Sequence, residues 1–92
     1  MAVTVVIPTP LRQFADGAAQ LVFEANNVGE ALDSLTTTYA ELRKHLFTDQ
    51  NALRSFVNVY VNDEDIRHAQ ALDTPVSDGD TVMIVPSIAG GC

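Results

Sequence analysis

The clearest helix pattern in this 92-residue chain lies between residues 28 and 42, with strand patterns on both sides of it. Its apolar residues recur at spacings of three and four, which places them on one face of an α-helix: Val28, Ala31, Leu32, Leu35, Tyr39 and Leu42. A single helix must bury this face against the surrounding strands. The pattern therefore predicts a two-layer α+β fold in which one main helix covers one face of a sheet.

The start of this helix carries a capping signal, whereas its end is ambiguous. Asn27 can accept a hydrogen bond from the first turn, and Glu30 can reach back as in a capping box. Residues 36–38 are threonines, which weaken a helix because β-branched side chains lose rotamer freedom in it. The helix therefore either ends near Tyr39 or continues for a further turn through Leu46.

Two β-rich segments precede the helix and predict an amino-terminal hairpin. Ala2–Ile7 is rich in valine and ends at Pro8, which cannot continue a strand ladder. Gln20–Ala25 follows a turn signal at Asp16 and Gly17.

The segment Arg54–Asn62 alternates between apolar and more polar residues, which predicts a strand with its valines on the core face. Phe56 and Tyr60 fall on the opposite face, which one helix layer leaves open. We therefore take Phe56 and Tyr60, together with Ile88, as candidate contacts with a partner protein.

The chain then continues with weaker and stronger strand signals. A short strand is expected at Ile66-Arg67, and Ser77–Asp80 is a turn signal. Thr81–Val85 is continuously apolar, which is typical either of a central strand covered on both faces or of a strand whose outer face meets a partner.

Composition narrows the class of partner. The formal net charge is −7 and the isoelectric point is about 4.3, which disfavours nucleic acid and anionic membranes and favours a protein partner with a basic face. The apolar start lacks a basic leader and is interrupted at Pro8, so we expect no signal peptide, no membrane span and a cytoplasmic protein.

Neither a disulfide nor a metal centre is expected. The chain has one cysteine, and its two histidines have no metal-ligand spacing. The carboxylates Asp63, Glu64 and Asp65 fit a solvated turn better than a cation site, since no further ligands follow at calcium-loop spacing. Docking of a basic partner is the minority interpretation of this cluster.

The chain ends PSIAGGC, and we divide it into a domain of residues 1–86 and a flexible tail of residues 87–92. Gly90 and Gly91 lack Cβ atoms, so their backbone can pass through a narrow channel. Ordering such residues costs about 1–2 kcal/mol each with little burial in return, so we expect the tail to order only inside a partner.

The segments FVNVYVNDEDIR and DGDTVMIVPSIAGG, with the helix start VGEALDSL, resemble the ubiquitin-like β-grasp sulfur carriers of the ThiS and MoaD families. Within these families the likeness is closest to the CysO-type carriers of cysteine biosynthesis, and it covers nearly the whole chain. It implies a β-grasp fold, a mixed sheet of four to five strands in which the last strand lies parallel to the first at the centre.

The resemblance also implies a function. An E1-like enzyme would use ATP to adenylate the carboxylate of Gly91, and sulfur would replace the adenylate to leave a thiocarboxylate. The carrier itself would have no catalytic residue and bind no cofactor. Further implied partners are a cysteine-synthase-like sulfur acceptor enzyme and a JAMM-type metalloprotease.

Cys92 departs from the active form of that family, which ends in Gly-Gly. It fits a removable encoded cap, a cysteine adduct formed on the thiocarboxylate, or a residue added for coupling. A catalytic thiol is disfavoured, because the neighbouring glycines supply neither a base nor a helix amino terminus.

Two other functions stay open from the sequence. One is the small subunit of a molybdopterin-synthase-like enzyme, which would insert the tail into a larger subunit. The other is a ubiquitin-like modifier or interaction module, in which self-linked chains would need Lys44, the only lysine, or the amino terminus.

Overall fold

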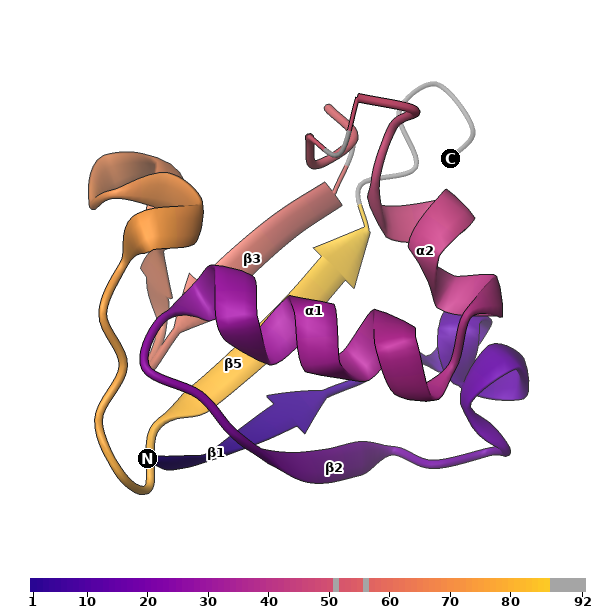
Figure 1. The fold of residues 1–92 in the computed structure, drawn as a ribbon, viewed down its shortest axis with the longest axis horizontal. Coiled ribbons are helices and arrows are strands. Elements are labelled where there is room, and N and C mark those ends of the chain that lie inside the picture. The colour runs from indigo at the N-terminus through magenta and orange to yellow at the C-terminus, as the bar shows by residue number, and fades with distance from the viewer. Residues whose placement is uncertain (51, 56, 87–92) are drawn as a thin grey trace.

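The computed structural model describes residues 1–50, 52–55 and 57–86, and Figure 1 shows a sheet with helices on one side. The strands of this sheet are β1 (Ala2–Val6), β2 (Gln20–Glu24), β3 (Val57–Val61), β4 (Glu64–Asp65) and β5 (Thr81–Pro86). The α-helices are α1 (Val28–Thr38) and α2 (Glu41–Leu46). Three short 3-10 helices complete the described part: η1 (Thr9–Ala15), η2 (Ile66–His68) and η3 (Ala71–Asp73).

The sheet is mixed, and its strand order is β2-β1-β5-β3-β4. β5 pairs parallel with β1, with Thr4 opposite Thr81, and antiparallel with β3, with Val59 opposite Ile84. β1 and β2 form the expected antiparallel hairpin. The predicted β-grasp topology is therefore confirmed, including the central position of the last strand.

The core lies between α1 and the sheet face that α1 covers (Figure 1). Alternate strand residues and one face of the helix meet there, as the two periodicities require. The fully or nearly fully buried members from these elements are Val3, Val5, Val28, Ala31, Leu32, Leu35, Val57, Val59, Val82 and Ile84. None of the helices in the described part is long and apolar enough to cross a bilayer.

The start of α1 is capped by side chains. Asn27 Oδ1 accepts a hydrogen bond of 2.8 Å from the backbone N–H of Glu30. Glu30 Oε1 reaches back to the N–H of Asn26 at 2.9 Å, one residue earlier than in a standard capping box. Two otherwise unsatisfied N–H groups are thereby paired, as the sequence predicts.

Both expectations for the end of the helix are partly right. α1 ends at Thr38, where the Thr38 hydroxyl donates to the carbonyl of Ser34 at 2.9 Å, and the chain turns at Tyr39 before α2 begins. The separate helix α2 then buries Leu42 and Leu46. The apolar pattern thus continues past Tyr39, but in a second helix.

The expected strand at Ile66-Arg67 is wrong. Asn62 and Asp63 have positive φ angles of 49° and 75°, as in the two-residue hairpin turn that matches the twist of paired strands. This tight turn places Glu64 directly opposite Val61, so the strand β4 comes earlier in the chain. Residues 66–68 instead form η2, capped by Asp65, whose Oδ1 accepts from the N–H of Arg67 at 2.8 Å.

Asp80 fixes the start of β5. Its Oδ2 accepts from the N–H of Ser77 at 2.7 Å, and its Oδ1 accepts from Nδ2 of Asn62 at 2.9 Å. Its backbone carbonyl accepts from the N–H of Thr4 at 2.9 Å. One residue therefore links the turn before β5 to β1 and to the end of β3.

The contribution of core burial to the free energy of unfolding can be tested with two valines. Val59→Ala should lower the free energy of unfolding by about 2 kcal/mol or more, because it removes buried methyl groups and leaves a cavity. The matched control Val22→Ala should cost less than about 1 kcal/mol. Val59 is 1% exposed and Val22 is 66% exposed. Urea unfolding measures both, and equal losses would contradict this core assignment.

The bonds to Asp80 predict a pH dependence. The Ser77 N–H, followed by the Asn62 amide, lowers the pKa of Asp80 from its ordinary value of 3.8. A depressed folded-state pKa contributes stability above the unfolded pKa, and this is lost as pH falls from about 4 toward the folded value. Asp80→Asn should thus be less stable than wild type at pH 7, with a difference that shrinks below pH 3.8.

Urea unfolding between pH 7 and pH 3 measures this difference. Asp49→Asn is the control, because it makes the same substitution at an exposed loop carboxylate. An Asp80→Asn difference that stays constant with pH would contradict the assigned role of the carboxylate.

Candidate partner-binding site

The central strand leads directly to the tail. β5 is paired on both edges, and its last residue, Pro86, lies opposite Val57 of β3. The chain therefore leaves the sheet from its middle, where the strand that precedes the tail is held on both sides. Residues 87–92 lie outside the described residues, and so does Phe56. The assignments of Ile88, Gly90, Gly91, Cys92 and Phe56 stay predictions.

β5 is covered on one face only. Val82 and Ile84 are buried on the side of α1, whereas Met83 and Val85 on the other side are 39% and 36% exposed. This arrangement matches the second of the two interpretations of the apolar run, a strand with an open outer face. A sheet face that exposes large apolar side chains is a candidate partner surface.

The open face has an apolar row across three strands. Val6 of β1 lies opposite Met83 of β5, and Met83 lies opposite Tyr60 of β3. We call the following half-buried and exposed residues on this side of the sheet the outer face: Thr4, Val6, Val22, Asn58, Tyr60, Met83 and Val85.

Tyr60 lies on this side as its strand alternation predicts, whereas Val6, Met83 and Val85 were not predicted to lie there. Their signal is the two-residue alternation of β1 and β5. In β5 this signal is masked because both sets of residues are apolar.

Two arginine side chains, those of Arg12 and Arg67, are hydrogen-bonded to backbone carbonyls. Arg12 Nε donates to the carbonyl of Ile7 at 2.9 Å. Arg67 Nη2 donates to the carbonyls of Ser55 and Val57 at 3.0 and 3.1 Å. Both side chains therefore have a structural function at the ends of strands.

Other candidate groups do not form a chemical site. Across the described residues, no group of three His, Cys, Asp or Glu side chains could hold a metal ion. Asp65, from the carboxylate cluster, caps η2. The ring of His45 stacks on Phe14 with centroids 4.3 Å apart, and its Nε2 is buried without a hydrogen-bond partner in the part that the structure describes.

Comparison with known proteins agrees with this geometry. The ThiS family model matches residues 5–91. The sulfur carrier protein CysO of Mycobacterium tuberculosis is 39% identical over 93 residues, which span 99% of this chain and 100% of the relative.

Two solved structures are similar over nearly their full length. CysO in its complex with BexX from Amycolatopsis orientalis has a TM-score of 0.88 and 40% identity, and the match covers 97% of this chain and 99% of that one. The small archaeal modifier protein 1 of Methanosarcina acetivorans has a TM-score of 0.86 and 31% identity, covering 98% and 96%.

The family match includes β2, β3, β4, β5 and the end of β1 from residue 5 onward, and it extends through Gly91. The relative from Mycobacterium tuberculosis, matched over its full length, is named a sulfur carrier protein. Together with its central parallel strand pair, these findings show that the chain belongs to the ThiS family and has the ubiquitin-like β-grasp fold.

Proposed function

We propose that this protein is a sulfur carrier that bears sulfur as a thiocarboxylate on Gly91. The observation that carries this proposal is the full-length similarity to CysO, combined with a family match that extends through Gly91. The open outer face beside β5 supports it, since a partner that binds there is already close to the start of the tail.

Partner enzymes carry out the chemical steps. A carboxylate is a poor acyl donor, so an E1-like enzyme first joins Gly91 to AMP from ATP and releases pyrophosphate. Hydrosulfide then attacks the carbonyl carbon, a C–S bond forms, and the bond to AMP breaks. The carrier supplies an acyl group that can be delivered and a surface that orients it, which needs no base or metal of its own.

We further propose cysteine biosynthesis as the pathway, on the basis of the similarity to CysO. The thiocarboxylate sulfur would add to an aminoacrylate held by a cysteine-synthase-like enzyme. The new amine would then take the acyl group from sulfur, which produces a Gly-Cys peptide bond.

This product has the same bond that joins Gly91 to Cys92. A JAMM-type metalloprotease would hydrolyse it, which frees cysteine and restores the Gly91 carboxylate. An encoded Cys92 would be removed in the same way before the first activation, because an amide cannot be adenylated.

A protein modifier is the second candidate function. The similarity to small archaeal modifier protein 1 favours it, at 31% identity and a TM-score of 0.86. In that case an activated Gly91 would form amide bonds with lysine side chains of other proteins.

Intact mass spectrometry of the protein from its host tests the proposed function. A species that ends at Gly91 with one oxygen replaced by sulfur is expected. Gly91→Leu should abolish it, because a side chain there blocks a channel built for glycine. The melting temperature should stay the same, since the change lies outside the paired strands. Conjugates to lysines without any thiocarboxylate would contradict the carrier and support the modifier.

The outer face can be tested separately. Met83→Glu should raise the KM for the carrier in adenylation by about tenfold, the effect of losing roughly 1.4 kcal/mol of binding at an interface residue. Val22→Glu is the control, because it adds the same charge on the same face but on the edge strand β2. Equal effects of both variants would show general repulsion and contradict a specific contact at Met83.

A further inference from the structure

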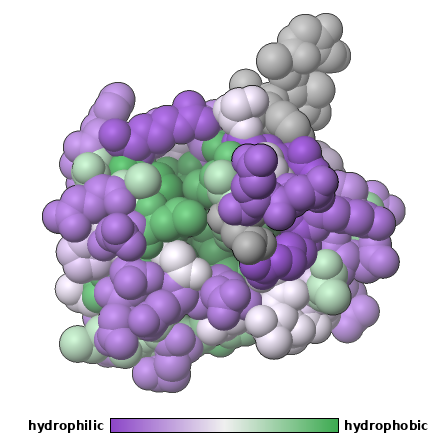
Figure 2. All heavy atoms as spheres, turned by 45° about the horizontal axis from the view of Figure 1, so that its top comes forward, coloured by the Kyte–Doolittle hydropathy of each residue, from purple (hydrophilic) through white to green (hydrophobic). Residues whose placement is uncertain are grey.

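A pocket of about 430 Å³ lies on the side of the sheet that faces away from the outer face. Its apolar lining comes from β3, η2, η3 and the segment before β3: Leu53, Val57, Val59, Ile66 and Leu72. The volume falls within the range of about 300–1,000 Å³ that is typical of ligand pockets. Figure 2 shows this region as a hydrophobic hollow framed by hydrophilic side chains.

Two arginines also line this pocket, and both are held in place by backbone carbonyls. Arg67 uses its Nη2 for the carbonyls of Ser55 and Val57, and Arg54 Nε donates to the carbonyl of Lys44 at 2.7 Å. Nη1 of Arg67 and both Nη groups of Arg54 make no hydrogen bond within the described residues. These N–H groups can donate hydrogen bonds to a carboxylate, which is the preferred partner of a guanidinium.

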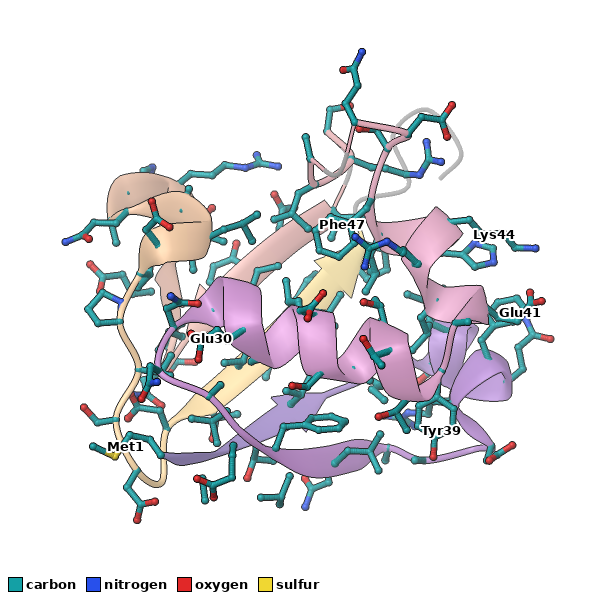
Figure 3. All side chains as sticks on the ribbon, in the orientation of Figure 1. Met1, Glu30, Tyr39, Glu41, Lys44 and Phe47 are labelled. Carbon is teal, nitrogen blue, oxygen red and sulfur yellow. The ribbon has the colours of Figure 1, made fainter. Side chains whose placement is uncertain are left out.

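The neighbouring cations have carboxylate partners, whereas these two guanidiniums do not within the described residues. Lys44 pairs with Glu41 at 3.1 Å, on the outer side of α2 (Figure 3), and Arg43 lies 3.7 Å from Asp33. Within the part of the chain that the structure describes, no carboxylate oxygen lies within 4.0 Å of a guanidinium nitrogen of Arg54 or Arg67. An acidic protein thus keeps two uncompensated positive charges beside one apolar pocket.

We propose that this pocket docks an acidic segment of a partner protein, with a large apolar side chain inside and carboxylates of the segment paired with Arg54 and Arg67. Charge complementarity selects this occupant, because the net charge of −7 repels acidic segments elsewhere on the surface. The apolar lining removes water from one side of the ion pair, which strengthens it. The contact supplies both affinity and orientation.

The position of the pocket relates this contact to the tail. Val57 lines the pocket and lies opposite Pro86, the last described residue before the tail. A partner anchored here holds residue 87 onward at a high effective concentration near its own active site. The inference rests on the proposed function, and it assigns the partner a local acidic segment where composition alone predicts a basic face.

The test uses the full chain with two purified host enzymes, the E1-like activating enzyme and the sulfur acceptor enzyme. The double variant Arg54→Gln/Arg67→Gln should weaken binding to at least one of them by about tenfold or more, as expected when interfacial charge contacts are lost. Its binding should also depend less on salt than that of wild type.

Lys44→Gln is the matched control, because it removes a positive charge that is already paired and lies outside the pocket lining. It should change binding less than about twofold, as for exposed ion pairs. Ala52→Trp fills the pocket from an exposed position without changing charge, and it should weaken binding of the same enzyme. This variant keeps the test decisive if the arginine variants prove unstable.

The proposal would be overturned if the double variant and Ala52→Trp both lost no more affinity for either enzyme than Lys44→Gln does. Weaker binding of Ala52→Trp alone would overturn the carboxylate half of it. Absence of any thiocarboxylate in wild type would instead count against the proposed function, so the two failures are distinguishable.

Discussion

The pairing of β5 between β1 and β3 is the constraint on which the rest of the structure depends. Val82 and Ile84 bury one side of this strand under the helical layer, and Asp80 fixes where the strand begins. The parallel pair with β1 brings together segments that are about 77 residues apart in the chain, from Thr4 to Thr81. Because the central strand is held on both edges, it provides a rigid base for whatever follows Pro86.

A carrier needs surfaces more than reactive groups, and this chain offers two on opposite sides of its sheet. The outer face is apolar and centred on Met83. The pocket on the other side combines apolar walls with the charges of Arg54 and Arg67. Under the proposed function, the partners that act on the tail in succession would therefore recognise the protein by different chemistry. The hydrogen bonds from Arg67 to the carbonyls of Ser55 and Val57 hold this guanidinium in place beside the pocket.

The spacing of apolar residues predicted most of the fold, because it indicates which side chains must be buried. The three-and-four spacing of α1 and the capping by Asn27 are properties of a few neighbouring residues, and both were predicted correctly. The prediction failed at Ile66, where an apolar residue within a short polar segment fits a strand and a 3-10 turn equally well. The outcome there depended on the two-residue turn at Asn62 and Asp63, which moved the strand pairing to an earlier position.

Local sequence patterns are enough to predict the class of fold, the amphipathic helix, the capped start of that helix and the glycine-containing end that resembles a sulfur carrier. They also place Tyr60 on the open side of the sheet, because alternation assigns each residue of a strand to a face. Only the tertiary structure decided which side of β5 is exposed and where the positive charges of Arg54 and Arg67 meet an apolar surface. Such features join residues that are distant in the chain, so no local period encodes them, and they exist only after the core has packed.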